Sequence, residues 1–192
     1  MDDVKAEYLA DIRRSFRSYK ALGDAALAQI PTEDALHKEL DPDSNSIAVI
    51  VKHVGGNLRS RFTDFLTTDG EKPDRRRDTE FEMVERASRA QVLEWWNNGW
   101  SAALASIDAL TADDLDRAVY IRGEAFTVVE ALNRSVTHIA YHVGQIVYLA
   151  RHLAAPNWRN LSIPKGQSAA FARGEFKQGI IERLANEAVR KG

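Results

Sequence analysis

Two histidines four residues apart, His138 and His142, have the clearest potential for chemistry in this sequence. In a helix, positions i and i+4 lie on one face about one turn apart, so both imidazoles could bind one metal ion. A third ligand must then come from elsewhere, and His53, in the segment SNSIAVIVKHVGGN, is the best candidate. Histidine pairs at this spacing are also common as ordinary polar residues, so the spacing alone leaves both interpretations open.

Three neutral imidazoles would leave a divalent ion its full charge and at least one open coordination position. Such an ion lowers the pKa of a bound water to about 7, or polarises a ligand oxygen or sulfur atom. Zinc and nickel suit imidazole ligands best and iron(II) is a further choice. Metal–nitrogen bonds of about 2.1 Å require the ligand nitrogens to lie within about 3–3.5 Å of one another.

Other polar residues can be ranked around these three histidines. Four of them could contact the ligands or a substrate: Asn57, Ser135 and Gln145, which share the helix edges of the histidines, and Tyr141, which lies on a different arc of its helix. Two further histidines have weaker cases, because His37 falls in a loop and His152 projects to the polar arc of its helix. We expect both of these to be solvated.

The elements that must position the histidines follow from the apolar periodicity. Residues 127–153 predict one long helix, opened by a capping box of Thr127 and Glu130. On this helix His138 and His142 lie about 90–130° from the midline of the apolar stripe, and His53 lies similarly on a predicted helix over residues 46–66. Such flanking positions predict a site at the rim of a groove between helices.

The remaining chain predicts two further long helices, over residues 4–27 and 89–110, and a last one over about 175–190. Between the second and third helices, residues 67–85 form a polar connection too long for a simple helix hairpin, and residues 118–126 are strand-like. We therefore predict an all-α fold: a four-helix bundle with a long crossover between helices 2 and 3, a small hairpin before helix 4 and a C-terminal helical extension. Residues 1–155 would form the bundle, and residues 156–192 an extension packed on the same domain.

Three local features each have two interpretations. The pair Gly55-Gly56 within a predicted helix indicates a close neighbouring backbone or ligand, and a tight helix crossing explains it equally well. The arginine run at 75–77, flanked by Asp74 and Asp78, is expected to be a solvated loop rather than a phosphate clamp. The tryptophans of the helix over 89–110 keep helical spacing, which favours core packing over a base-stacking platform.

Composition limits the function classes. A net charge of −2 gives no electrostatic case for binding nucleic acid or an anionic membrane. The absence of cysteine excludes disulfides, thiolate metal sites and a cysteine nucleophile, and suits a reducing cytoplasm. The first residues have no apolar stretch typical of a signal peptide, and no run approaches the ~20 apolar residues that span a bilayer. We expect a cytoplasmic protein without nucleic-acid or membrane partners.

The block NSIAVIVKHVGGNLRSRFTDFLTTDGEKPDRRRDTEF at residues 45–81, together with the pair on the fourth helix, resembles the DinB/YfiT-like superfamily of metal-binding four-helix bundles, and within it an uncharacterised bacterial subgroup. The resemblance covers about residues 5–154 and extends into SIPKGQSAAF. In that superfamily one histidine of the second helix and two of an HxxxH on the fourth bind a divalent metal. This maps onto His53, His138 and His142 without a gap.

The resemblance also implies an activity. Characterised relatives include thiol S-transferases that use bacillithiol or related low-molecular-weight thiols, a mycothiol-dependent isomerase, and proteins described as metal-dependent hydrolases. It therefore implies a metal-dependent enzyme acting on small molecules, either an S-transferase whose metal activates a thiol or a hydrolase. Related bundles are often homodimers. The alternative is a non-catalytic metal-binding or stress-related dimeric bundle.

Overall fold

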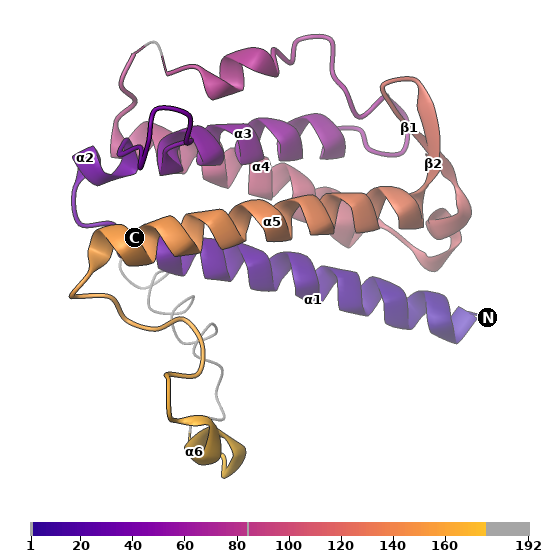
Figure 1. The fold of residues 1–192 in the computed structure, drawn as a ribbon. Helices are drawn as coiled ribbons and strands as arrows, with labels where there is room; N and C mark the ends of the chain where they lie inside the picture. The colour runs from indigo at the N-terminus through magenta and orange to yellow at the C-terminus, as the bar shows by residue number, and fades with distance from the viewer. Residues whose placement is uncertain (1, 84, 176–192) are drawn as a thin grey trace.

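A computed structural model describes residues 2–83 and 85–175 of the chain, and four long helices dominate it (Figure 1). These helices are α1 (Asp2–Leu27), α3 (Ile47–Phe62), α4 (Arg89–Ala109) and α5 (Val128–Ala154). The short elements are α2 (Glu33–Leu36), the 3-10 helices η1 (Asp78–Phe81) and η2 (Ala112–Asp116), the strands β1 (Ala118–Ile121) and β2 (Glu124–Thr127), and α6 (Ser168–Ala172). A mostly helical chain with one small hairpin is confirmed. The helix predicted over 175–190 lies almost entirely outside the described residues.

Side-chain caps determine where three of the long helices begin. The hydroxyls of Ser46, Ser88 and Thr127 each accept a hydrogen bond from the backbone N–H three residues further along. At Thr127 the carboxylate of Glu130 accepts the N–H of the capping residue in return, so the predicted capping box is present. Each cap satisfies an N–H that has no partner within the helix, which is worth about 1 kcal/mol.

The core lies where the apolar faces of the four long helices meet. Helix α3 packs against α4 and α5, and α1 packs against α5 and α4. Trp96 and Trp100 are completely buried there, and Phe16 of α1 meets the Trp100 ring edge-on at 6.3 Å between centroids. Core packing is therefore the role of these two tryptophans, as their helical spacing predicts.

Helices α3 and α4 cross unusually closely, and glycines make the crossing possible. A Cβ atom added at Gly99 would overlap the backbone of Gly55, and one added at Gly55 would overlap the backbone carbonyl of Trp95. A tight helix crossing is thus the reason for the first glycine of the Gly55-Gly56 pair. Gly56 faces a different neighbour, the side chain of Glu80.

The polar connection between α3 and α4 runs back along α3, with η1 in contact with that helix (Figure 1). This arrangement covers one side of α3 with residues that no helical periodicity relates to it. As a result, the η1 side chain of Glu80 can reach His53 on α3 although the two are 27 residues apart in the sequence.

The β1–β2 hairpin closes the end of the molecule near the start of α5 (Figure 1). Its strands pair antiparallel from Ala118 opposite Thr127 to Ile121 opposite Glu124. The two turn residues, Arg122 and Gly123, both have positive φ, as a tight two-residue hairpin turn requires. The Asp69 carboxylate accepts the backbone N–H groups of these two turn residues at 2.8 and 2.7 Å, which ties the hairpin to the α3–α4 connection.

After α5 the chain turns back toward the end of α1. The side chain of Gln29 exchanges two hydrogen bonds with the backbone of Arg159, at 3.2 and 2.7 Å. Leu161 is buried and joins the apolar core. Within the described part of the chain, no helix combines the length and apolar character needed to cross a membrane.

Candidate metal centre

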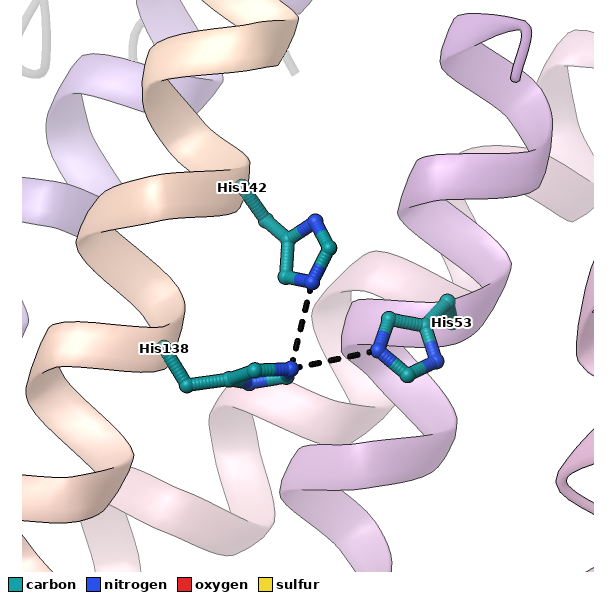
Figure 2. A group of neighbouring side chains, drawn as sticks. All are labelled: His53, His138 and His142. Atoms are coloured by element: carbon teal, nitrogen blue, oxygen red, sulfur yellow. Dashed lines mark hydrogen bonds between the residues drawn. The ribbon is translucent and has the colours of Figure 1, made fainter. Parts of the chain in front are cut away.

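The three predicted histidines meet between α3 and α5 (Figure 2). His138 Nε2 lies 3.2 Å from His53 Nε2 and 3.1 Å from His142 Nε2. The three ligand nitrogens all lie within 4.8 Å of one another. The two closest separations fall in the range that a shared metal ion with bonds of about 2.1 Å would require. The three imidazoles point their Nε2 atoms at one common position, as Figure 2 shows.

Hydrogen bonds at the opposite ring nitrogens fix the orientation of two of these imidazoles. His53 Nδ1 donates to the Glu80 carboxylate at 2.8 Å, and His142 Nδ1 donates to Gln145 Oε1 at 2.8 Å. A neutral imidazole that carries its proton on Nδ1 has a lone pair on Nε2. Both rings therefore direct a lone pair toward the common position, which is the arrangement that metal-binding histidines adopt.

This donor set fits a divalent metal ion. With the Nε2 atoms of His53 and His142 unprotonated, the single N–H that His138 could place there can satisfy only one of them. At least one lone pair would then face another nitrogen without a proton between them, in a partly buried site. A cation at the common position satisfies all three lone pairs, so the three histidines would hold it.

The electrostatics of the site keep the imidazoles of His138 and His142 neutral. Burial, together with the neighbouring rings of His142 and His53, lowers the pKa of His138 to about 3. Burial also lowers the pKa of His142, against a smaller opposing effect of its bond to Gln145. Neutral imidazoles are the form that binds metal, so these pKa shifts favour metal binding at neutral pH.

Glu80 holds His53 and is itself held by Arg75. The Arg75 guanidinium donates from Nε and Nη2 to the Glu80 carboxylate at 2.8 and 2.9 Å. Burial alone would raise the pKa of Glu80, but the hydrogen bonds from His53 and Arg75 outweigh it and lower the pKa. The carboxylate is therefore charged, and it accepts the hydrogen bond that His53 Nδ1 donates. A Cβ atom at Gly56 would overlap this carboxylate, so the second glycine of the pair leaves room for it.

The arginine run at 75–77 is not uniformly solvated, and the prediction is wrong for its first member. The side chain of Arg75 is only 3% exposed, because its guanidinium bridges Glu80 and Glu71. Arg76 and Arg77 are exposed, as the flanking acidic residues led us to expect. Arg75 points inward because its guanidinium pairs there with the buried carboxylate of Glu80 and the half-buried carboxylate of Glu71.

The site is deeper on one side than the predicted groove rim. His53 is buried, whereas His138 and His142 are half-buried. The difference arises because η1 covers His53: the Phe81 ring lies 4.7 Å from the His53 ring, between centroids. The other side opens into a pocket of about 540 Å³ that all three histidines line.

The remaining predicted residues fall into two groups. Gln145 orients His142, and Asn57, Ser135 and Tyr141 line the same pocket as the histidines. Tyr141 is 65% exposed, with its ring 5.1 Å from that of His142.

The two histidines with weaker cases lie apart from this pocket, whose lining includes neither of them. His152 is exposed, as predicted. His37 is half-buried, with its Nε2 2.8 Å from the Ala87 carbonyl oxygen, so the expectation that it is solvated is wrong. The carbonyl explains this difference, because it gives a loop imidazole a fixed partner inside the protein.

Sequence reasoning missed the two residues that support His53. Glu80 and Arg75 lie in a polar connection, 27 and 22 positions after that histidine, and no periodicity links them to it. Gly56 was the one available signal, because an internal helix glycine indicates that something approaches the helix closely.

Fold and site together define a mostly helical protein with a candidate three-histidine metal centre. The chain belongs to the family described as "Protein of unknown function (DUF1572)", whose model matches residues 3–167. Apart from the first residue of α1, this match includes α1 to α5 and all three histidines. No curated protein matches the chain significantly.

Proposed function

We propose that this protein is a divalent-metal-dependent enzyme acting on small molecules, with His53, His138 and His142 as the metal ligands. The observation that carries the proposal is the convergence of three imidazole Nε2 atoms, two of them oriented by bonds at Nδ1. Zinc or nickel suits such ligands best, and iron(II) is the third choice. The packing of the four long helices against one another supports a DinB-like four-helix bundle.

The pocket beside the histidines favours an enzyme over a purely structural metal site. Structural zinc sites use four protein ligands, whereas three ligands leave a coordination position open. The volume of about 540 Å³ is in the range that binds small molecules. When bound, the metal would supply a Lewis acid that activates a thiol or water for attack on an electrophile. We propose a thiol-dependent S-transferase first and a hydrolase second.

The residues of the chain itself would prepare this site. Glu80 would keep the His53 proton on Nδ1, and Gln145 would do the same for His142. Asn57 and Ser135, which line the pocket, could hydrogen-bond to a substrate, and Tyr141 could cover its solvent side. The alternative is a non-catalytic metal-binding or stress-related bundle, in which the same residues would only stabilise the fold.

Metal analysis of the purified protein tests the first step. We expect about one equivalent of a divalent metal per chain in the wild-type protein, and a loss of most of it in His142→Ala. The matched control is His152→Ala, because His152 is an exposed histidine on the same helix and outside the pocket. Full metal content in His142→Ala would refute this set of ligands.

Turnover is a separate test of the enzyme proposal. The metal-loaded protein should transfer a low-molecular-weight thiol to a model electrophile such as 1-chloro-2,4-dinitrobenzene, or hydrolyse a model ester or amide. His142→Ala should abolish that activity while His152→Ala retains it. A metal-loaded protein without either activity would favour the non-catalytic alternative.

The same superfamily resemblance leads us to propose a homodimer. Analytical ultracentrifugation at micromolar concentration should give the mass of two chains. A monomer under these conditions would contradict this part of the proposal without affecting the metal site.

A further inference from the structure

The pocket that contains the three histidines is lined by an unusual concentration of arginine. Five guanidinium groups line it, and no aspartate or glutamate does: the arginines are Arg61, Arg75, Arg77, Arg122 and Arg134. The chain as a whole has a net charge of −2, so this positive lining is a local feature. A concave pocket focuses such a potential and attracts anions.

Three of the five arginines are engaged with carboxylates behind the pocket. Glu71 Oε2 accepts hydrogen bonds from Arg61 at 3.1 Å, Arg75 at 3.4 Å and Arg122 at 3.1 Å. Arg75 is also paired with Glu80, and the same carboxylate accepts a hydrogen bond from His53 Nδ1. Two carboxylates therefore accept hydrogen bonds from three guanidinium groups and one imidazole, so the positive charges of the arginines outnumber the negative charges that pair with them.

Arg77 and Arg134 add to this excess. Arg77 lies over the Phe81 ring at 5.1 Å, and its nearest carboxylate, on the exposed Asp78, is 3.6 Å away. Arg134 lies over the Phe126 ring at 5.8 Å. Within residues 2–83 and 85–175, no carboxylate lies within 4 Å of the Arg134 guanidinium. An aromatic ring under a guanidinium group holds its plane while leaving N–H donors at its edge available.

Both arginines line the same pocket as the three histidines. Arg134 precedes His138 by four residues on α5, which places it one helical turn away on the same face. The Phe81 ring contacts both the Arg77 guanidinium and the His53 ring. An anionic group held by these arginines would thus extend into the pocket toward the three histidines.

We propose that the small-molecule substrate of this pocket carries an oxyanion, a carboxylate or phosphate group, which Arg77 and Arg134 bind beside the metal centre. Planar guanidinium groups suit both anions, because each presents paired N–H donors to two oxygen atoms. The proposal rests on the proposed function for the reaction, which takes place at the histidines. The arginine contacts themselves do not require the metal.

Isothermal titration calorimetry of the metal-loaded protein at constant ionic strength tests this inference. The probes are inorganic phosphate and succinate, with succinamide as the uncharged control. We expect at least one anion to bind and succinamide not to bind. Arg77→Gln and Arg134→Gln should each weaken binding by about tenfold, because each removes charge-assisted hydrogen bonds. Arg151→Gln, on the same helix and outside the pocket, should have no effect.

The outcomes separate the sources of the anion and the two proposals. Binding of phosphate alone assigns a phosphorylated substrate, and binding of succinate alone assigns a carboxylate. No binding of either anion, or binding unchanged in the Arg77→Gln/Arg134→Gln double variant, would overturn the inference. Repeating the titration after metal removal distinguishes anion binding by the arginines from anion binding by the metal, because the binding that depends on the arginines should persist. Metal content should stay at the wild-type level in the double variant, so a loss of metal there would point to damage at the proposed metal site instead.

Discussion

The substitution Glu80→Gln isolates the contribution of one buried carboxylate to the metal centre. Glu80 accepts three hydrogen bonds, from His53 Nδ1 at 2.8 Å and from Arg75 at 2.8 and 2.9 Å, and its side chain is only 9% exposed. Glutamine keeps the shape but loses the negative charge, and its NH₂ group must face a donor. The substitution therefore weakens the control of the His53 proton and leaves Arg75 with only Glu71, at 3.4 Å.

Two magnitudes follow from this geometry. Removal of a carboxylate that supports a metal-ligating histidine lowers metal affinity by about 10–100-fold, which is about 1.4–2.7 kcal/mol. Breaking a buried ion pair costs about 3–5 kcal/mol of folding stability, and we expect the lower end because Glu71 still contacts Arg75. The variant should thus remain folded at 25 °C and bind metal more weakly.

The assay is competition for zinc against a chromophoric chelator, with circular dichroism to confirm that the variant is folded. Glu82→Gln is the matched control, because this exposed residue lies two positions further along the same connection. We expect wild-type affinity for the control and at least a tenfold loss for Glu80→Gln. A folded Glu80→Gln protein with wild-type zinc affinity would refute the argument that this carboxylate prepares His53.

Further substitutions test the packing and the caps. Gly56→Ala should lower zinc affinity as Glu80→Gln does, because the added Cβ atom would displace the Glu80 carboxylate. A Gly56→Ala variant with wild-type zinc affinity would contradict the idea that this glycine makes room for Glu80. Gly99→Ala should cost about 3 kcal/mol in urea denaturation, since its Cβ would overlap the backbone of Gly55, whereas Gly144→Ala, with open space at its Cβ, should gain up to about 1 kcal/mol. Hydrogen bonds from the Thr127 N–H and hydroxyl lower the pKa of Glu130, so its contribution to stability is present above its unfolded pKa of about 4.3 and is lost as the pH falls through the lower folded pKa. Glu130→Gln should therefore make acid unfolding less steep, as measured by circular dichroism between pH 5 and 2, and an unchanged profile would argue against the capping box.

The starts of the long helices and their core faces could be predicted from the sequence because their causes are local, whereas the helix predicted over residues 46–66 ends at Phe62. Thr127 and Glu130 are three residues apart, and the cap they form is present in the structure. Trp96 and Trp100 are four residues apart and both face the core. The turn residues of the hairpin lie between two short strand-like segments. In each case the interacting groups are neighbours along the chain, so spacing and residue type were sufficient.

The two halves of the candidate site differ in this respect. The sequence by itself determined that His138 and His142 lie on one helix face and made His53 the best candidate for a third ligand, which the family resemblance supported. Only the tertiary structure decided that the three Nε2 atoms converge, that Glu80 and Arg75 support His53, and that Arg77 and Arg134 line the same pocket. Glu80, Arg75 and Arg77 reach the site because the α3–α4 connection folds back along α3. The path of such an irregular segment depends on contacts between distant residues that local spacing does not encode.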